Sequence, residues 1–181
     1  MRDELSDGRI RIRRWRMEDL DALYEAVRES VKEVSPWLPW CHAGYTPEET
    51  AAFLRSSTAG WDSGEHYGFG IFDSEARTLL GGVGLNQLNG LHRYANLGYW
   101  VRSSRTGRGV ASSAVRLAAR FGLEDVCLQR IEIVIAVANS ASQRAAEKAG
   151  ATREGVLRKR LLTSAGPLDA VMYSLVTEDF N

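Results

Sequence analysis

The chain has 181 residues, of which 44% are hydrophobic and 25% charged, a profile typical of a soluble globular protein that needs no metal or disulfide to hold its core. Basic and acidic residues balance at 23 each, so no net field favours nucleic acid or an anionic membrane. No apolar leader or membrane-length apolar run is present. Cys41 and Cys127 stand alone, which predicts reduced thiols, no metal site and a cytoplasmic location.

The first part of the chain predicts a strand followed by a helix. Apolar residues nearly alternate with arginines over 10–15, which indicates a half-exposed strand. From Leu20 to Val31 apolar residues recur at helical spacing and form one face of an amphipathic helix. Two closely spaced prolines exclude a regular helix over 35–45.

A second helix has a specific N-terminal signal. Thr46 is the expected N-cap, Pro47 occupies the first helical position and Glu49 closes a capping box. This helix is predicted to run to about Thr58. The remaining predicted elements are, in order, strands at 67–72 and 78–88 joined by a turn at 73–76, a strand at 95–102, a helix at 110–122, a strand at 131–137, a helix at 140–149, and strands at 152–162 and 168–176.

This order predicts an α/β fold with a mixed central sheet of about seven strands and helices on both faces. The strand–helix–strand crossover in the second half requires a parallel pair, whereas the hairpins require antiparallel pairs. No repeat, low-complexity tract or linker interrupts the pattern, so residues 1–181 are predicted to form one domain.

A glycine-containing loop, TGRGVA at residues 106–111, lies between a predicted strand and a predicted helix. The first turn of a helix has unpaired N–H groups and a partial positive charge, and glycine allows an anion to come close to the backbone. Arg105 and Arg108 add positive charge beside these amides. The layout indicates a phosphate site, although a tight turn without a ligand explains the same residues. The loop fits neither the P-loop pattern nor the dinucleotide-binding pattern.

A second strand-to-helix junction follows one crossover later, with NSAS at residues 139–142. Ser140 and Gln143 are expected to form a capping box, and Asn139 and Ser140 could be caps with no other role. Neighbouring parallel strands that end at one sheet edge, each followed by a helix N-terminus, frame the ligand site of open α/β sheets. The glycines at 81–84 lie inside a strand, and we expect a bulge or a close approach of another chain or a ligand there.

These residues together resemble the GNAT N-acetyltransferase superfamily, and in particular its ribosomal-protein alanine/serine N-acetyltransferase (RimJ/RimL-type) branch. The resemblance covers nearly the whole chain. It rests on TGRGVA at 106–111, LQRIE at 128–132, NSAS at 139–142, EKAGA at 147–151, SPWLPW at 35–40, LGYWV at 97–101, REGVLR at 153–158 and DAVMYSL at 169–175.

The resemblance implies acetyl-CoA as co-substrate and assigns its contacts. Thr106 stands where the family usually has glutamine or arginine, which weakens one phosphate contact that Arg105 or Arg108 could replace. The pantetheine arm would run beside residues 100–102, and Asn139 would meet the arm or its thioester. The implied cofactor-binding set is Trp100, Val101, Arg102, Arg105, Thr106, Gly107, Arg108, Gly109, Val110, Ala111, Asn139 and Ser142.

The implied reaction is direct attack of a primary amine on the acetyl thioester in a ternary complex. Ser142 is the candidate catalytic proton donor or thiolate partner, together with Asn139, and backbone N–H groups near Trp100 and Val101 would stabilise the oxyanion. The base is the open question, because the family's carboxylate positions hold Asn96 and Leu161. The remaining loose candidates are Glu132, Glu154, His66 and His92.

The missing strong base favours an acceptor of low pKa. An α-amine, with a pKa of about 7.7–8.0, is roughly one third neutral at pH 7.5, whereas a lysine amine is neutral at about one part in a thousand. We therefore expect a protein N-terminus or a small-molecule amine as acceptor. Trp37, Trp40 and Tyr45 are the candidate acceptor wall, although these aromatic residues could equally pin a loop to the core.

Two other classes of function stay open at this point. A non-catalytic acyl-CoA-binding or sensing domain would explain the absent base, and an interaction module would retain only the fold. No nucleic-acid or membrane partner is indicated by the sequence. Many relatives form dimers, so a homodimer is also compatible with the resemblance.

Overall fold

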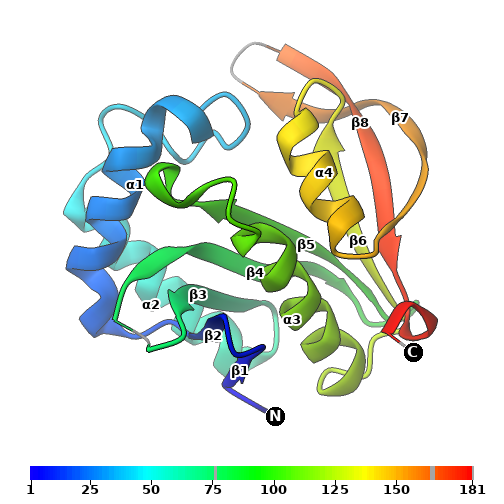
Figure 1. Ribbon diagram of the computed structural model, residues 1–181, viewed down its shortest axis with the longest axis horizontal. Coiled ribbons are helices and arrows are strands. Elements are labelled where there is room, and N and C mark those ends of the chain that lie inside the picture. The colour runs from blue at the N-terminus through cyan, green and yellow to red at the C-terminus, as the bar shows by residue number, and fades with distance from the viewer. Residues whose placement is uncertain (76, 164–165, 181) are drawn as a thin grey trace.

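The computed structural model describes residues 1–75, 77–163 and 166–180. Within these residues one mixed sheet of eight strands runs in the order β1-β2-β3-β4-β5-β6-β8-β7 (Figure 1). The strands are β1 Glu4–Ser6, β2 Ile10–Arg14, β3 Tyr67–Asp73, β4 Leu79–Asn89, β5 Tyr94–Val101, β6 Arg130–Ala136, β7 Thr152–Thr163 and β8 Gly166–Leu175. The mixed sheet is confirmed, and the short edge strand β1 is the one that the sequence pattern missed.

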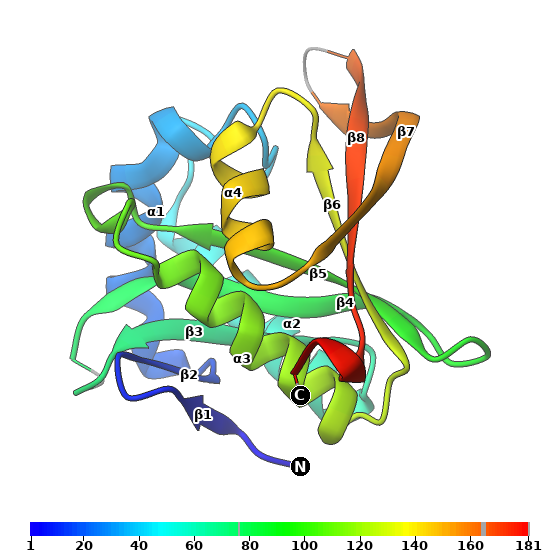
Figure 2. The ribbon, with the colours of Figure 1, turned by 45° about the vertical axis from the view of Figure 1, so that its right-hand side comes forward.

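Helices cover both faces of this sheet, as predicted (Figures 1 and 2). The helices are α1 Leu20–Val34, α2 Pro47–Ser63, α3 Val110–Glu124 and α4 Ser140–Lys148, with short 3-10 turns η1 Met17–Asp19, η2 Ser103–Arg105 and η3 Thr177–Phe180. Buried residues of α1 and α2 share one hydrophobic cluster with Trp15 and Phe72, while α3 and α4 pack with the larger cluster on the other side. None of the described helices is long and apolar enough to cross a membrane.

The second helix begins as the sequence predicts and ends later. Thr46 accepts a hydrogen bond from the Glu49 backbone, and the Glu49 carboxylate accepts one from the Thr46 backbone, which completes the capping box. The helix continues past Thr58 because its buried face extends to Trp61. Gly64, in the left-handed conformation with φ of 74°, then ends it.

The glycines of β4 form the expected bulge. Ile71 pairs with Gly81 but Phe72 pairs with Leu79, so Leu80 is the extra residue. A Cβ atom on Gly81, whose φ is 153°, would lie 2.2 Å from the Trp100 carbonyl oxygen. Glycine is therefore required where β5 approaches β4, and the close neighbour is a strand of the same chain.

The parallel pair is short, and its two strands separate. β5 pairs with β6 from Tyr94–Arg130 to Asn96–Glu132, and within the described residues no pairing of these strands continues beyond that point. β5 stays on β4 as far as Val101, whereas β6 continues along β8 to Ala136. Figure 2 shows β5 and β6 running apart. The part of β5 after Asn96 lies on the diverging side.

Candidate active site

The diverging edge of β5 carries backbone groups that face away from β4. The N–H of Arg102 donates to the carbonyl of Leu80 at 2.8 Å. Because bonding alternates along an antiparallel ladder, the N–H and C=O groups of Leu97, Tyr99 and Val101 point to the side that β6 has left. An extended ligand can pair with this edge as an added strand would.

Of the predicted pantetheine contacts on this strand, Val101 has the suitable backbone orientation. The Arg102 backbone N–H is used by Leu80, and its guanidinium bonds Glu25 and Glu29 of α1 at 2.6 and 2.5 Å. Arg102 therefore ties the end of β5 to α1. Trp100 points to the α1/α2 side, where its ring lies 5.7 Å from that of Trp40.

The loop before α3 has the backbone form that an anion site needs. Gly107 and Gly109 have φ of 73° and 76°. This left-handed conformation is unfavourable for residues that carry a Cβ atom. Gly109 is the N-cap of α3, and in the described structure no side chain caps that helix, so its first-turn N–H groups stay available. Val110 and Ala111 form the first turn, and the Thr106 hydroxyl donates to the Ser103 carbonyl at 3.0 Å.

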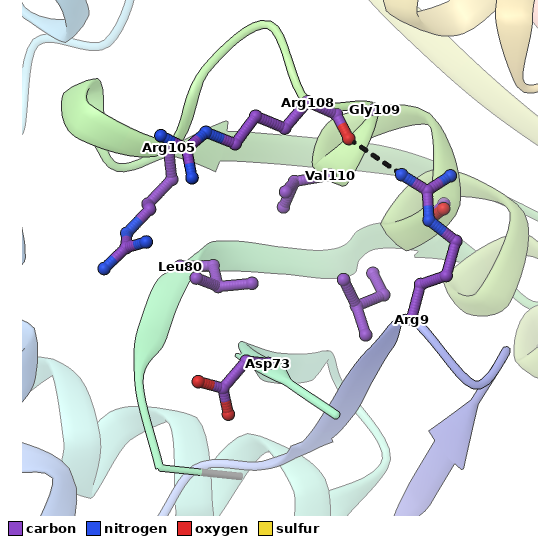
Figure 3. Close-up of a pocket in the computed structure, with 9 residues that line it drawn as sticks. Arg9, Asp73, Leu80, Arg105, Arg108, Gly109 and Val110 are labelled. Atoms are coloured by element: carbon purple, nitrogen blue, oxygen red, sulfur yellow. Dashed lines mark hydrogen bonds between the residues drawn. The ribbon is translucent and has the colours of Figure 1, made fainter. Parts of the chain in front are cut away.

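Arginines surround this loop. Arg9, Arg105 and Arg108 line a cavity of about 210 Å³ together with Asp73 (Figure 3). The Arg9 guanidinium donates to the Arg108 carbonyl at 3.0 Å and so holds the loop from the β1–β2 turn. The local charge is positive although the whole chain is neutral. Arg9 was not predicted, because nothing in its sequence neighbourhood connects it to a loop about a hundred residues away.

Asn139 is the N-cap of α4, which corrects the expected capping box of Ser140 and Gln143. The Asn139 side chain accepts from the Ser142 backbone N–H at 3.1 Å. The Gln143 amide instead donates to the Val137 carbonyl at 2.7 Å and ties the helix back to the end of β6. The cap therefore falls one residue earlier than the sequence pattern suggests.

Ser142 lies against Tyr99, a residue that the sequence reasoning missed. The Ser142 hydroxyl donates to the Tyr99 oxygen at 2.8 Å, and the Tyr99 hydroxyl donates to the Ser142 carbonyl at 2.8 Å. Burial raises the pKa of Tyr99 to about 12 despite the hydrogen bond from Ser142, so the phenol stays protonated at neutral pH. The pair joins α4 to the free edge of β5. The alternation of Tyr99 and Trp100 was the available signal, since neighbouring side chains on a strand face opposite ways.

A larger cavity of about 900 Å³ lies on the α1/α2 side. Trp40 and Tyr45 line it, while Trp37 is not part of its lining. Tyr45 is buried at 7% exposure and Trp40 is 42% exposed, so Tyr45 also belongs to the core and Trp40 presents a free aromatic surface. The walls are mainly apolar and aromatic, and Tyr99, Trp100 and Val134 contribute from the diverging strands.

The four candidate bases lie in different surroundings, and they differ in whether they reach the large cavity. Glu154 and Glu132 both pair with Arg130, and the hydrogen bonds from Arg130 lower the pKa of Glu154 to about 2. His92 lies in the exposed β4–β5 turn. His66 lines the large cavity, as do Asn96 and Leu161.

His42 and Glu49 line the same cavity and were not among the candidates. Their side chains lie 3.0 Å apart, and this hydrogen bond lowers the pKa of Glu49. Both side chains are nearly half exposed. No sequence motif predicts this pair, because the capping box of α2 already accounts for Glu49.

Comparison with known proteins agrees with this geometry. The profile of the acetyltransferase (GNAT) domain matches residues 9–152. The protein YjcK of Bacillus subtilis, named as a probable N-acetyltransferase, is 36% identical over 118 residues, or 65% of each chain. The ribosomal-protein-serine acetyltransferase of Escherichia coli is 23% identical over 86% of each chain. RimJ of Mycobacterium smegmatis, solved in complex with CoA-disulfide, superposes with a TM-score of 0.83 at 25% identity, covering 94% of this chain and 83% of that one.

The chain belongs to the GNAT acetyltransferase family. Its relatives include ribosomal-protein acetyltransferases of the RimJ/RimL type, as the sequence resemblance indicated. The class of enzyme, an acetyl-CoA-dependent N-acetyltransferase, is thereby confirmed, and the CoA-disulfide complex of RimJ agrees with acetyl-CoA as the co-substrate. The matched segment spans just under two thirds of the YjcK chain.

Proposed function

We propose that this protein transfers the acetyl group of acetyl-CoA to the α-amine of a protein N-terminus, or to a small-molecule amine of similar pKa, within a ternary complex. The observation that carries the proposal is the position of Tyr99 and Trp100 on the diverging edge of β5. Tyr99 contacts Ser142 of α4, and Trp100 lines the cavity under α1 and α2. The edge thus lies between a cofactor side and an acceptor side.

On the cofactor side, the loop at 106–111 is our proposed pyrophosphate site. The amides at the N-terminus of α3 and the side chains of Arg105 and Arg108 supply the positive charge that two phosphates require. The free N–H and C=O groups of Tyr99 and Val101 would pair with the amides of the pantetheine arm. Asn139 supports this arrangement by fixing the first turn of α4.

The protein would have to assist three events in the reaction: loss of a proton from the amine, build-up of negative charge on the carbonyl oxygen, and protonation of the thiolate. The amine nitrogen forms a bond to the acetyl carbon, the bond from that carbon to sulfur breaks, and the amine loses a proton while the thiolate gains one. A backbone N–H on the β5 edge would stabilise the negative oxygen. The Ser142 and Tyr99 hydroxyls would direct a proton to the thiolate, with Tyr99 kept neutral by its raised pKa.

Roughly one third of an α-amine acceptor would arrive neutral at pH 7.5. Asn96 and Leu161, at the positions where relatives are expected to carry a base, line the cavity without a titrating group. His66 is the one of our four base candidates that lies at the cavity. An α-amine with a pKa near 7.7–8.0 needs little help at neutral pH, and this supports an N-terminal acceptor, as does the relative named for a ribosomal protein.

The free thiols Cys41 and Cys127 and a ribosomal acceptor would both suit a cytoplasmic enzyme. A non-catalytic acyl-CoA-binding domain is the alternative. Two measurements separate them: binding of CoA by calorimetry, and release of free thiol from acetyl-CoA with a panel of amines. The proposal predicts both binding and amine-dependent release. CoA binding without thiol release in the presence of any amine would favour a sensing domain. Absence of CoA binding would indicate an interaction module that retains only the fold.

A further inference from the structure

The acceptor cavity has a polar spot in its wall. Ser57 of α2 is 1% exposed and lines the cavity. Its hydroxyl has no hydrogen-bond partner among the described residues. A buried hydroxyl without a partner is costly, because it gives up water and gains nothing in return. A buried hydroxyl without a partner in the wall of a cavity is therefore a candidate contact for a ligand atom.

The indole N–H of Trp15 lies near this hydroxyl over Gly68, and the indole N–H of Trp100 lies further along the same sheet face over Gly82. A Cβ atom placed on Gly68 would lie 2.6 Å from the Ser57 oxygen and 3.6 Å from Trp15 Nε1. A Cβ atom placed on Gly82 would lie 2.7 Å from Trp100 Nε1 and 3.3 Å from the Trp15 ring. Trp15, Ser57 and Trp100 form what we call the donor cluster, and all three line the cavity.

The absence of side chains on the sheet makes room for this cluster. Gly68 pairs with Gly84 and Gly70 pairs with Gly82 across β3 and β4. A side chain on Gly68 or Gly82 would overlap Ser57 or Trp100. In the described structure the Trp61 indole bonds the Gly68 carbonyl at 2.8 Å, whereas neither Trp15 nor Trp100 has a hydrogen-bond acceptor within the chain.

The chemistry of the donor cluster specifies its ligand. An indole N–H only donates, and a serine hydroxyl donates readily, so the cluster requires an oxygen with lone pairs. All three groups are neutral, and Arg160, the arginine in the lining, comes exposed from β7. A carboxylate without a charged partner would lose more hydration than neutral donors return. A neutral carbonyl oxygen fits this apolar surrounding better.

We propose that the donor cluster binds an amide carbonyl oxygen of the acceptor, so that the enzyme selects an amine carried on a peptide over a simple alkylamine. The proposal rests on the proposed acetyltransferase function and adds a residue set to its acceptor side. It explains why β3 and β4 carry glycines here, since side chains at these positions would overlap the donor cluster. It also explains why a cavity that is mostly aromatic keeps unpaired polar atoms.

The first experiment compares a short peptide amide with an alkylamine of matched length, each assayed at the same concentration of neutral amine. Wild-type kcat/KM should favour the peptide at least tenfold. Ser57→Ala and Trp15→Phe should each reduce this ratio several-fold without changing CoA affinity. Ser56→Ala, an exposed neighbour on α2, is the matched control and should leave the ratio unchanged. A wild-type ratio near one, or a ratio that neither variant changes, would overturn the proposal.

A second measurement does not depend on catalysis. The indole N–H signals in a ¹H–¹⁵N NMR spectrum should shift for Trp15 and Trp100 when the peptide amide is added to the CoA-bound protein. Trp37, outside the cavity lining, is the internal control and should not shift. No shift at Trp15 and Trp100 with saturating peptide would reject the donor cluster. If these signals shift but no amine releases thiol, the proposed function fails while the donor cluster stands.

Discussion

The hydrogen-bonded pair of Tyr99 and Ser142 joins residues that are 43 positions apart in the sequence. Ser142 could be selected from its motif, since it follows Asn139 at a strand-to-helix junction. Tyr99 could not, because its partner is decided by the face on which α4 packs against the diverging strands. The donor residues Trp15 and Ser57 were missed for the same reason. Each has an ordinary local role on a strand end or a helix, and only the tertiary fold brings them to one cavity.

Replacing Tyr99 by phenylalanine tests the role of this pair. We expect kcat to fall by about 10²-fold, in the lower range for loss of a positioned proton donor, while the Kd for CoA changes little. Because the pKa of Tyr99 lies near 12, the wild-type phenol stays protonated below that value and should add no falling limb to the rate between pH 6 and 9. Tyr94→Phe, on the same strand but away from Ser142, is the control. Equal kcat for Tyr99→Phe and wild type would remove Tyr99 from the mechanism.

At the level of elements, the order of helices and strands could be predicted from hydrophobic periodicity and helix caps. The shortest strand, the end of α2 and the cap residue of α4 could not. The strand β1 has three residues, too few for alternation to be recognised. Helix α2 is longer than predicted because its buried face continues through Gly60 to Trp61. The cap of α4 falls on Asn139 because its side chain accepts from the Ser142 N–H, while the Gln143 side chain donates to the carbonyls of Ala136 and Val137.

The glycine at the start of α3 can be tested against a matched glycine elsewhere. Gly109→Ala places a residue with a side chain in the left-handed conformation, which costs about 1–2 kcal/mol of stability. It should also weaken CoA binding about tenfold, because the first-turn amides of α3 are displaced. Gly64→Ala has nearly the same φ, 74° against 76°, and lies at the end of α2. It should cost similar stability in urea unfolding without changing the Kd for CoA. Equal CoA affinity in both variants would contradict the loop assignment.

The bulge in β4 makes a prediction about stability. Gly81→Ala should lower the free energy of unfolding by about 1–3 kcal/mol, as expected for a steric conflict that the backbone must absorb, because the new Cβ overlaps the Trp100 carbonyl. Gly90→Ala, in a turn with no neighbour within 4 Å, should change stability far less. Chemical denaturation of both variants measures the difference. Equal losses would mean that the approach of β5 to β4 is not constrained by this glycine.

For the whole molecule, the separation of β5 from β6 is the feature that joins the two sides of the site. A mixed sheet could be predicted from the mixture of hairpins and one crossover. The large cavity could not, since its walls come from α1, α2 and their connection, the glycine faces of β3 and β4, and β7. Such a space depends on which side chains are absent as much as on those present, and this is visible only after the elements have packed.

The acceptor assignment is tested most directly with one peptide that carries both a free α-amine and a lysine side chain. After incubation with acetyl-CoA at pH 7.5, mass spectrometry locates the acetyl group. The α-amine is roughly 300 times more often neutral than the lysine amine, and no strong base is assigned to the acceptor cavity. We therefore expect acetylation at the N-terminus with lysine essentially unmodified. Faster acetylation of the lysine side chain, under conditions where CoA binds, would contradict it.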